Sequence, residues 1–90
     1  MKSELTKEFV ERFRNLPERV KRTARKNYRL WARDPRHPSV EFKKLNASMP
    51  IHSVRGGIGW RAVGVLKEPD TIVWFWIGPH SEYDKLLRHL

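Results

Sequence analysis

The 90-residue sequence has no cysteine, no apolar run long enough for a membrane span, and about half as many acidic as basic residues. Without cysteine there is no disulfide framework, no thiolate metal ligand and no cysteine nucleophile. The longest apolar run, TIVWFWI, falls far short of the ~20 residues that cross a bilayer. The first residues, MKSELTKEF, carry scattered charges and no apolar segment, so they do not form a secretory signal. We expect a cytoplasmic protein with no membrane partner.

What the chain does contain is enough apolar material for one modest core. Hydrophobic residues make up 39% of the sequence, including four tryptophans and four phenylalanines. No internal repeat or low-complexity tract divides the chain. We expect a single domain spanning residues 1–90.

The charge is strongly positive and unevenly placed. The net charge is +9, with 14 basic and 6 acidic residues in positions 1–45 against 5 and 4 in positions 46–90. An excess of this size indicates an acidic partner, such as a nucleic acid, an anionic membrane surface or an acidic protein.

Two helices are predicted in the first half. The first spans Ser3–Asn15, with Ser3 as N-cap, and Pro17 opens the second. Their apolar stripes at helical spacing are Leu5, Phe9, Phe13 and Leu16, then Val20, Ala24, Tyr28 and Trp31. We expect the two helices to form a hairpin.

The second helix carries a basic face opposite its apolar stripe. Its members are Arg22, Arg25, Lys26, Arg29 and Arg33. A solvated helix face is one interpretation. However, like charges three and four positions apart repel one another, which favours a face that contacts phosphates or an acidic partner protein.

The second half predicts a sheet. An alternating segment at Val40–Leu45 is followed by a loop at 46–50, and then by strands starting at Ile51, at Trp60–Leu66 and at Thr71–Ile77. The GGIG and KEPD segments between the last three strands are typical of turns, so these strands form an antiparallel meander. Thr71–Ile77 is the best candidate for a central strand. The meander brings Arg55, Arg61 and the exit of the last strand close together.

Several motifs, in order, carry a family resemblance. They are PSVEFK, SVRGGIGWRAVG and WIGPHSEYD, which follow the two helices. From about Phe9 to Leu87 the chain resembles the RelE/ParE superfamily of bacterial toxins from type II toxin–antitoxin systems, in the RelE-like and HigB-like branch. This resemblance implies an α+β fold. In it, an N-terminal helical hairpin packs on a twisted antiparallel sheet of about four strands, followed by a short C-terminal helix.

The resemblance also implies a function. Many members are ribosome-dependent endoribonucleases that cut mRNA and are silenced by a cognate antitoxin protein. Others with the same fold poison DNA gyrase and cleave nothing, and fold alone does not choose between them. A non-catalytic RNA-binding module that uses the basic helix is a third alternative.

Metal-free RNA cleavage needs a base, cationic donors and an acid. Arg61 matches the arginine that RNA-cleaving members place on the scissile phosphate, and Arg55 is a second cation nearby. His80 suits a general acid or base, because imidazole titrates near neutrality, and Tyr83 suits base stacking or proton transfer. Lys43 and Lys44 are candidates for further phosphate contacts, together with Arg22, Arg25, Lys26 and Arg29.

Structural alternatives exist for each of these residues. Both arginines are compatible with solvent-facing strand positions, His80 with a helix cap and Tyr83 with a core position. The strand before the glycine-rich turn, IHSVR, contains Arg55 as its one permanently charged cation. Because it lacks the cluster of lysines and arginines on which some RNA-cleaving members rely, the general base stays unassigned. The four histidines fit no metal-ligand spacing, so no metal or small-molecule cofactor is expected. Of Trp60, Trp74 and Trp76, we expect Trp74 and one neighbour in the core.

Overall fold

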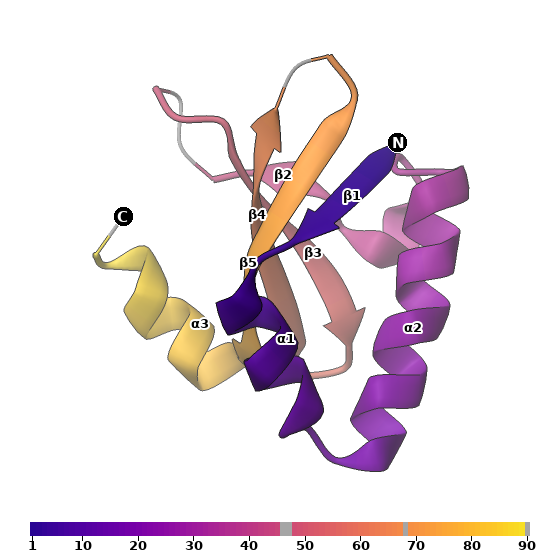
Figure 1. Ribbon diagram of the computed structural model, residues 1–90, viewed down its shortest axis with the longest axis vertical. Helices are drawn as coiled ribbons and strands as arrows, with labels where there is room; N and C mark the ends of the chain where they lie inside the picture. Colours follow the sequence, from indigo (N-terminus) through magenta and orange to yellow (C-terminus); the bar gives the residue numbers. More distant parts are fainter. Residues whose placement is uncertain (46–47, 68, 90) are drawn as a thin grey trace.

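Five strands form one mixed sheet in the order β1-β5-β4-β3-β2, with helices on both faces (Figure 1). The computed structural model describes residues 1–45, 48–67 and 69–89. Asn46 and Ala47 of the predicted loop and Glu68 of the predicted turn lie outside these ranges. The elements are β1 (Lys2–Leu5), α1 (Lys7–Arg14), α2 (Glu18–Arg33), a 3₁₀ turn (Pro38–Val40), β2 (Lys43–Lys44), β3 (Ile51–Gly57), β4 (Trp60–Lys67), β5 (Thr71–Pro79) and α3 (His80–Leu87).

The predicted antiparallel meander is confirmed. In β3 and β4, Arg55 lies opposite Arg61, and in β4 and β5, Arg61 lies opposite Gly78. β5 is an interior strand, because β1 pairs with its other edge, while β4 is the middle strand of the five.

The N-terminal prediction is wrong at its first turn. Residues Lys2–Leu5 are not helical; they form β1, which runs parallel to β5. The Trp74 indole N–H donates to Ser3 Oγ at 3.2 Å, so Ser3 anchors a strand and does not cap a helix. The N-cap is Thr6, whose Oγ1 accepts from the Phe9 N–H at 3.1 Å. Leu5 is 54% exposed and lies outside the predicted stripe.

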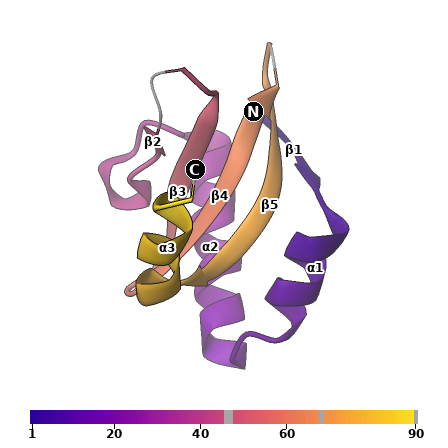
Figure 2. The same cartoon turned by 90° about the vertical axis from the view of Figure 1, so that its left-hand side faces the viewer.

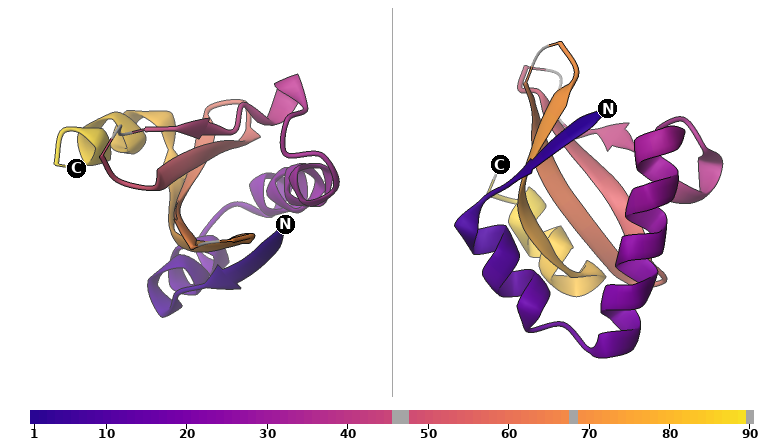
Figure 3. Two further views of the ribbon diagram at one scale, coloured as in Figure 1. Left: turned by 90° about the horizontal axis from the view of Figure 1, so that it is seen from above. Right: turned by 45° about the vertical axis from the view of Figure 1, so that its right-hand side comes forward.

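The two predicted helices are present, but they are splayed apart. α1 packs mainly on β5 and α2 mainly on β3 (Figure 3). α2 begins immediately after Pro17, as predicted. Val20, Ala24 and Trp31 are buried, whereas Tyr28 is 44% exposed at the edge of the stripe.

The predicted strand at Val40–Leu45 is mostly wrong. Val40 ends the 3₁₀ turn, Glu41 has a left-handed backbone with φ 45°, and only Lys43–Lys44 pair with β3. Val40 is buried and Glu41 is exposed. The left-handed residue interrupts the extended backbone, and it turns the Glu41 side chain toward the neighbouring strands.

The core has two parts, one on each face of the sheet. The larger part, beneath α1 and α2, includes Trp31 and Trp74, and the smaller part, beneath α3, includes Trp76 and Tyr83. Figure 2 shows α3 on the opposite side of the sheet from α2. Trp74 and Trp76 lie on opposite faces because Phe75 is an extra residue in β5, at a register shift against Val63 and Gly64. None of the described helices is long and apolar enough to cross a membrane.

Candidate active site

The candidate site lies where the β3–β4 hairpin turns and α3 begins. A groove of about 210 Å³ opens there, and its lining residues are Glu41, Arg55, Gly57, Gly59, Trp60, Arg61 and His80. The meander register brings the two arginines together. A backbone hydrogen bond from the His80 N–H to the Gly59 carbonyl (2.8 Å) joins the start of α3 to the hairpin. Arg55, Arg61 and His80 therefore reach one groove from three different elements.

Arg61 is the buried cation of the groove. It is 7% exposed, and its Nη2 donates to Glu41 Oε1 at 3.0 Å. Its guanidinium carbon lies 5.7 Å from the centre of the Tyr83 ring. Nη1 is also buried and has no hydrogen-bond partner among the described residues. A buried cation with an unused donor is costly in a structural role, and it indicates a site for an anion.

Glu41 completes the site, and the sequence analysis missed it. Its Oε2 accepts from Arg55 Nη1 at 3.1 Å while Oε1 accepts from Arg61, so one carboxylate bridges both arginines. The hydrogen bond from Arg61 and the charges of Arg61, Arg55 and Lys43 hold the pKa of Glu41 below its ordinary 4.5. A signal was available: Glu41 is the only acid between Asp34 and Glu68, within a basic stretch.

The lowered pKa links this contact to stability. A carboxyl whose pKa is lower in the folded state stabilises the fold above its unfolded pKa. The contribution of Glu41 is therefore present at neutral pH, and it is lost as the pH falls from 4.5 through the lowered pKa.

His80 lies at the mouth of the groove. It is the first residue of α3, with Pro79 in the N-cap position, and its side chain is 54% exposed. Its Nδ1 is 3.4 Å from Asp84 Oδ2, and its ring lies edge-on to Tyr83 at 5.4 Å between centroids. The imidazole is thus oriented from two sides yet open to a ligand.

Tyr83 supports the groove from below and does not line it. The residue is 3% exposed, and its hydroxyl donates to Ser53 Oγ at 3.1 Å. Its ring contacts both His80 and the Arg61 guanidinium. The structure therefore brings Tyr83 to the site by its ring, with its hydroxyl turned into the smaller core.

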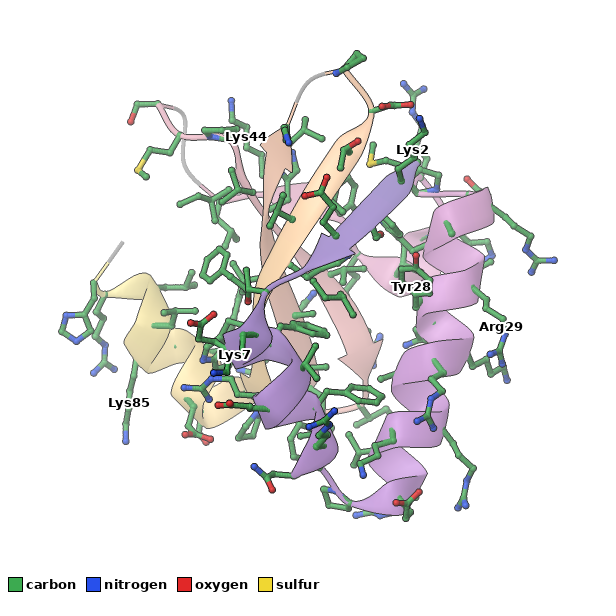
Figure 4. The ribbon with its side chains drawn as sticks, viewed as in Figure 1. Lys2, Lys7, Tyr28, Arg29, Lys44 and Lys85 are labelled. Carbon is green, nitrogen blue, oxygen red and sulfur yellow. The ribbon has the colours of Figure 1, made fainter. Side chains whose placement is uncertain are left out.

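The other predicted phosphate-contacting residues lie outside the groove. All are exposed: Arg22, Arg25, Lys26 and Arg29 on α2, and Lys43 and Lys44 on β2. In Figure 4, Arg29 points away from the sheet and Lys44 lies at the far end of β2. Arg25 turns toward α1, with its guanidinium 5.1 Å from the Phe13 ring. Lys43 is close enough to lower the pKa of Glu41.

No cluster of three or more His, Asp or Glu side chains that could hold a metal occurs in residues 1–45, 48–67 and 69–89. The arginines, the carboxylate and the imidazole therefore make up the ionisable chemistry of the groove. A pair of cations suits an anionic group such as a phosphate, and a carboxylate and an imidazole in the same groove suit proton transfer.

The fold that carries this site is that of the RelE-like toxins. A chain of the RelE–RelB complex from Pyrococcus horikoshii matches 87% of this chain and 92% of its own length, with 16% identity and a TM-score of 0.68. The RelB–RelE antitoxin–toxin complex from Methanococcus jannaschii matches over 91% and 96%, with 15% identity and a TM-score of 0.71. A copper-bound mutant toxin from Helicobacter pylori matches over 91% and 97%, with 20% identity and a TM-score of 0.62.

These likenesses confirm the predicted fold class, with a fifth, parallel strand added to the sheet. No protein-family model and no curated protein matches the sequence. The similarity is thus one of fold, at sequence identities of 15–20%.

Proposed function

We propose that this protein is the toxin of a toxin–antitoxin pair. In this proposal it acts in the cytoplasm and cleaves mRNA by a reaction that needs no metal ion. The observation that carries the proposal is the single groove in which Glu41 and His80 flank Arg55 and Arg61. The likeness to RelE toxins supports the toxin assignment.

The groove supplies the three groups that the reaction needs. Glu41 takes the proton of a 2′-hydroxyl, and the 2′-oxygen attacks the adjacent phosphorus. The two arginines neutralise the extra negative charge of the phosphorane. His80, protonated, donates a proton to the departing 5′-oxygen as the P–O bond breaks. The products are a 2′,3′-cyclic phosphate and a free 5′-hydroxyl.

Substrate binding would itself activate the base. Without RNA, Arg55 and Arg61 are bonded to Glu41 and keep its carboxylate weakly basic. A phosphate that takes over those donors removes the cause of the lowered pKa, so the basicity of Glu41 rises when substrate arrives. The buried Nη1 of Arg61 is an additional donor that the rearrangement can bring into use.

In this mechanism Tyr83 is a positioning residue. Its ring lies under the Arg61 guanidinium and against His80, while its hydroxyl is held by Ser53. A cation over an aromatic face is stabilised by the ring, so Tyr83 holds the Arg61 guanidinium in the position where it would contact the phosphate.

The exposed basic residues indicate a substrate larger than one nucleotide. None of Arg22, Arg25, Lys26, Arg29 or Lys44 lines the groove, so a polyanion that contacts them must extend well beyond the cleaved bond. Ribosomal RNA around a translated mRNA presents such a surface. Contacts of this kind add affinity but no sequence choice. This supports a ribosome-dependent reaction.

The proposal is tested by inducing the wild-type chain and His80→Ala in bacteria and mapping mRNA ends by primer extension. We expect the wild type to arrest growth and to produce new cuts within translated codons. His80→Ala should lower cleavage about 10²- to 10⁴-fold, because the leaving oxygen loses its acid. His89→Ala, a histidine outside the groove, is the matched control. Growth arrest with intact mRNA would favour a gyrase-directed toxin, and RNA binding without cleavage would favour a regulatory module.

A second surface fits the antitoxin. An apolar groove of about 560 Å³ lies on the face of the sheet that α1 and α2 cover, and its lining includes Leu5, Phe9, Val10, Phe13, Tyr28 and Trp31. Arg14 and Arg25 also line it, as does Arg55, which is shared with the active-site groove. We propose that an acidic, amphipathic segment of the cognate antitoxin occupies this groove. Because Arg55 belongs to both grooves, a carboxylate bound there would compete with the RNA phosphate.

Tyr28→Glu is expected to weaken antitoxin binding at least ~10-fold, since it places a charge on an apolar surface that the complex buries. The partner to use is the cognate antitoxin, titrated calorimetrically at 0.15 M salt. Ser81→Glu is the matched control, because it adds the same negative charge at an exposed position of α3 outside both grooves. Equal losses for both variants would contradict docking in this groove.

A further inference from the structure

The tip of the β3–β4 hairpin carries apolar side chains where polar turn residues are usual. Ile58 is 87% exposed, the highest value among the exposed large apolar residues of the described chain. The residues next to it, Gly57 and Gly59, have no side chains to cover it. An isolated exposed isoleucine is ordinary, but this one lies beside a groove that binds an anion in the proposed function.

Trp60 is the second apolar residue at this tip. Trp31, Trp74 and Trp76 are at most 6% exposed, whereas Trp60 is partly exposed and belongs to neither core cluster. No ring contact to Trp60 occurs among the described residues, although each of the other three indoles has at least one. This indole therefore has little structural reason to be a tryptophan.

Its position relative to the site is well defined. Trp60 precedes Arg61 in β4, and in the sheet it lies opposite Pro79, the neighbour of His80. Trp60 lines the same groove as both of these ionisable residues. Trp60 is thus the neighbour of the proposed phosphate-binding cation in β4 and lies across the sheet from the neighbour of the proposed acid.

The hairpin tip is held in place from two sides. At Gly57, with φ 134°, an added Cβ would come within 2.9 Å of Thr23 Cγ2, so the tip packs closely on α2. On the other side, the Gly59 carbonyl accepts the His80 backbone N–H. Trp60 is therefore presented by a fixed hairpin and needs little ordering when a ligand arrives.

From these observations we infer that Trp60, with Ile58 beside it, is a stacking wall for a nucleobase next to the cleaved phosphate. The inference rests on the proposed function. It assigns a binding position to a nucleobase of the substrate, next to the position proposed for the phosphate at Arg55 and Arg61. Every base has a π face, so stacking on an indole positions the nucleotide while tolerating different sequences.

The test uses single-stranded hexanucleotides with 2′-deoxy sugars, which bind but cannot be cleaved, with or without an abasic residue at the third position. Binding is followed by fluorescence anisotropy of an end label. Trp60→Leu should weaken binding of the intact strand about 5- to 100-fold, and Trp60→Phe, which keeps a ring, should stay within about 3-fold of wild type. Binding of the abasic strand should be the same for wild type and Trp60→Leu.

The possible failures are distinguishable. One outcome is that the wild type binds the intact strand and cleaves RNA, but Trp60→Leu discriminates intact from abasic strands as well as the wild type does. That outcome overturns the stacking inference and leaves the proposed function standing. If wild type prefers neither strand and no RNA is cleaved on ribosomes, the proposed function fails with it. An unchanged near-ultraviolet spectrum of Trp60→Phe apart from the lost indole confirms that the comparison is between folded proteins.

Discussion

Arg61→Ala is expected to reduce RNA cleavage about 10²- to 10³-fold, mainly in kcat, because the phosphorane loses its best-placed cation. Arg61 is 7% exposed, and its guanidinium is held by Glu41 and lies over the Tyr83 ring, so its position before the reaction is already fixed. Preorganised charge of this kind acts more strongly than a mobile surface cation. Cleavage of a defined mRNA on purified ribosomes under single-turnover conditions measures the effect.

Arg61→Lys sharpens this prediction. Lysine keeps the charge but not the planar fork, so one ammonium cannot both pair with Glu41 and present separate donors to a phosphate. We expect Arg61→Lys to recover less than a tenth of wild-type activity. Arg88→Ala, an exposed arginine outside both grooves, is the control and should cleave at the wild-type rate. Wild-type cleavage by folded Arg61→Ala would remove the phosphate site from the mechanism.

The position of Arg61 was predictable because it depends on local signals. Alternating residues in β4 and glycines at 56, 57 and 59 predict a hairpin, and a hairpin places Arg55 opposite Arg61 without knowledge of the rest of the fold. The next turn brings the start of α3, and with it His80, to the same end of the sheet. Three of the groove's ionisable residues therefore follow from contacts between consecutive elements.

β1 was missed because its local pattern is misleading. Leu5 stands four residues before Phe9, which fits a helical stripe, yet Lys2–Leu5 pair with a strand about 70 residues away. As a strand, Lys2–Leu5 pair with β5, and Ser3 accepts a hydrogen bond from Trp74. The same residues would lose both contacts if they were helical. Such non-local pairing overrides weak helix propensity and leaves no periodic trace in four residues.

Glu41 was missed for a related reason. Its partners lie 14 and 20 residues along the chain, and the contact depends on one left-handed backbone angle. Glutamate seldom adopts the left-handed backbone conformation, so its presence at position 41 does not predict one. The alternating V-E-F-K segment instead favours a regular strand. The buried hydroxyl of Tyr83 likewise depends on Ser53, 30 residues away. The sequence placed Tyr83 near the site, but the hydrogen bond of its hydroxyl, like both contacts of Glu41, depends on the folded arrangement.

Glu41→Gln is expected to separate binding from catalysis. Glutamine keeps the size of the side chain but takes no proton, and its neutral amide oxygen competes with phosphate for Arg55 and Arg61 much more weakly than the carboxylate does. Cleavage should fall about 10²- to 10⁴-fold, while the affinity for an uncleavable 2′-deoxy strand should increase. Loss of a merely structural ion pair would lower both. Single-turnover rates and anisotropy titrations on the same preparation measure the two quantities, with Glu82→Gln, on the exposed first turn of α3, as the matched control.

The pH dependence gives the same hypothesis a second, independent check. In the free enzyme Arg61 holds the pKa of Glu41 below 4.5, so the acidic limb of kcat/KM should lie below that pH. In the RNA complex the arginines have moved to the phosphate, so the acidic limb of kcat should lie at a higher pH than that of kcat/KM. Both limbs should disappear in Glu41→Gln. Coinciding limbs in the wild type would mean that the arginines stay on Glu41 throughout the reaction, and another group would then have to be the base.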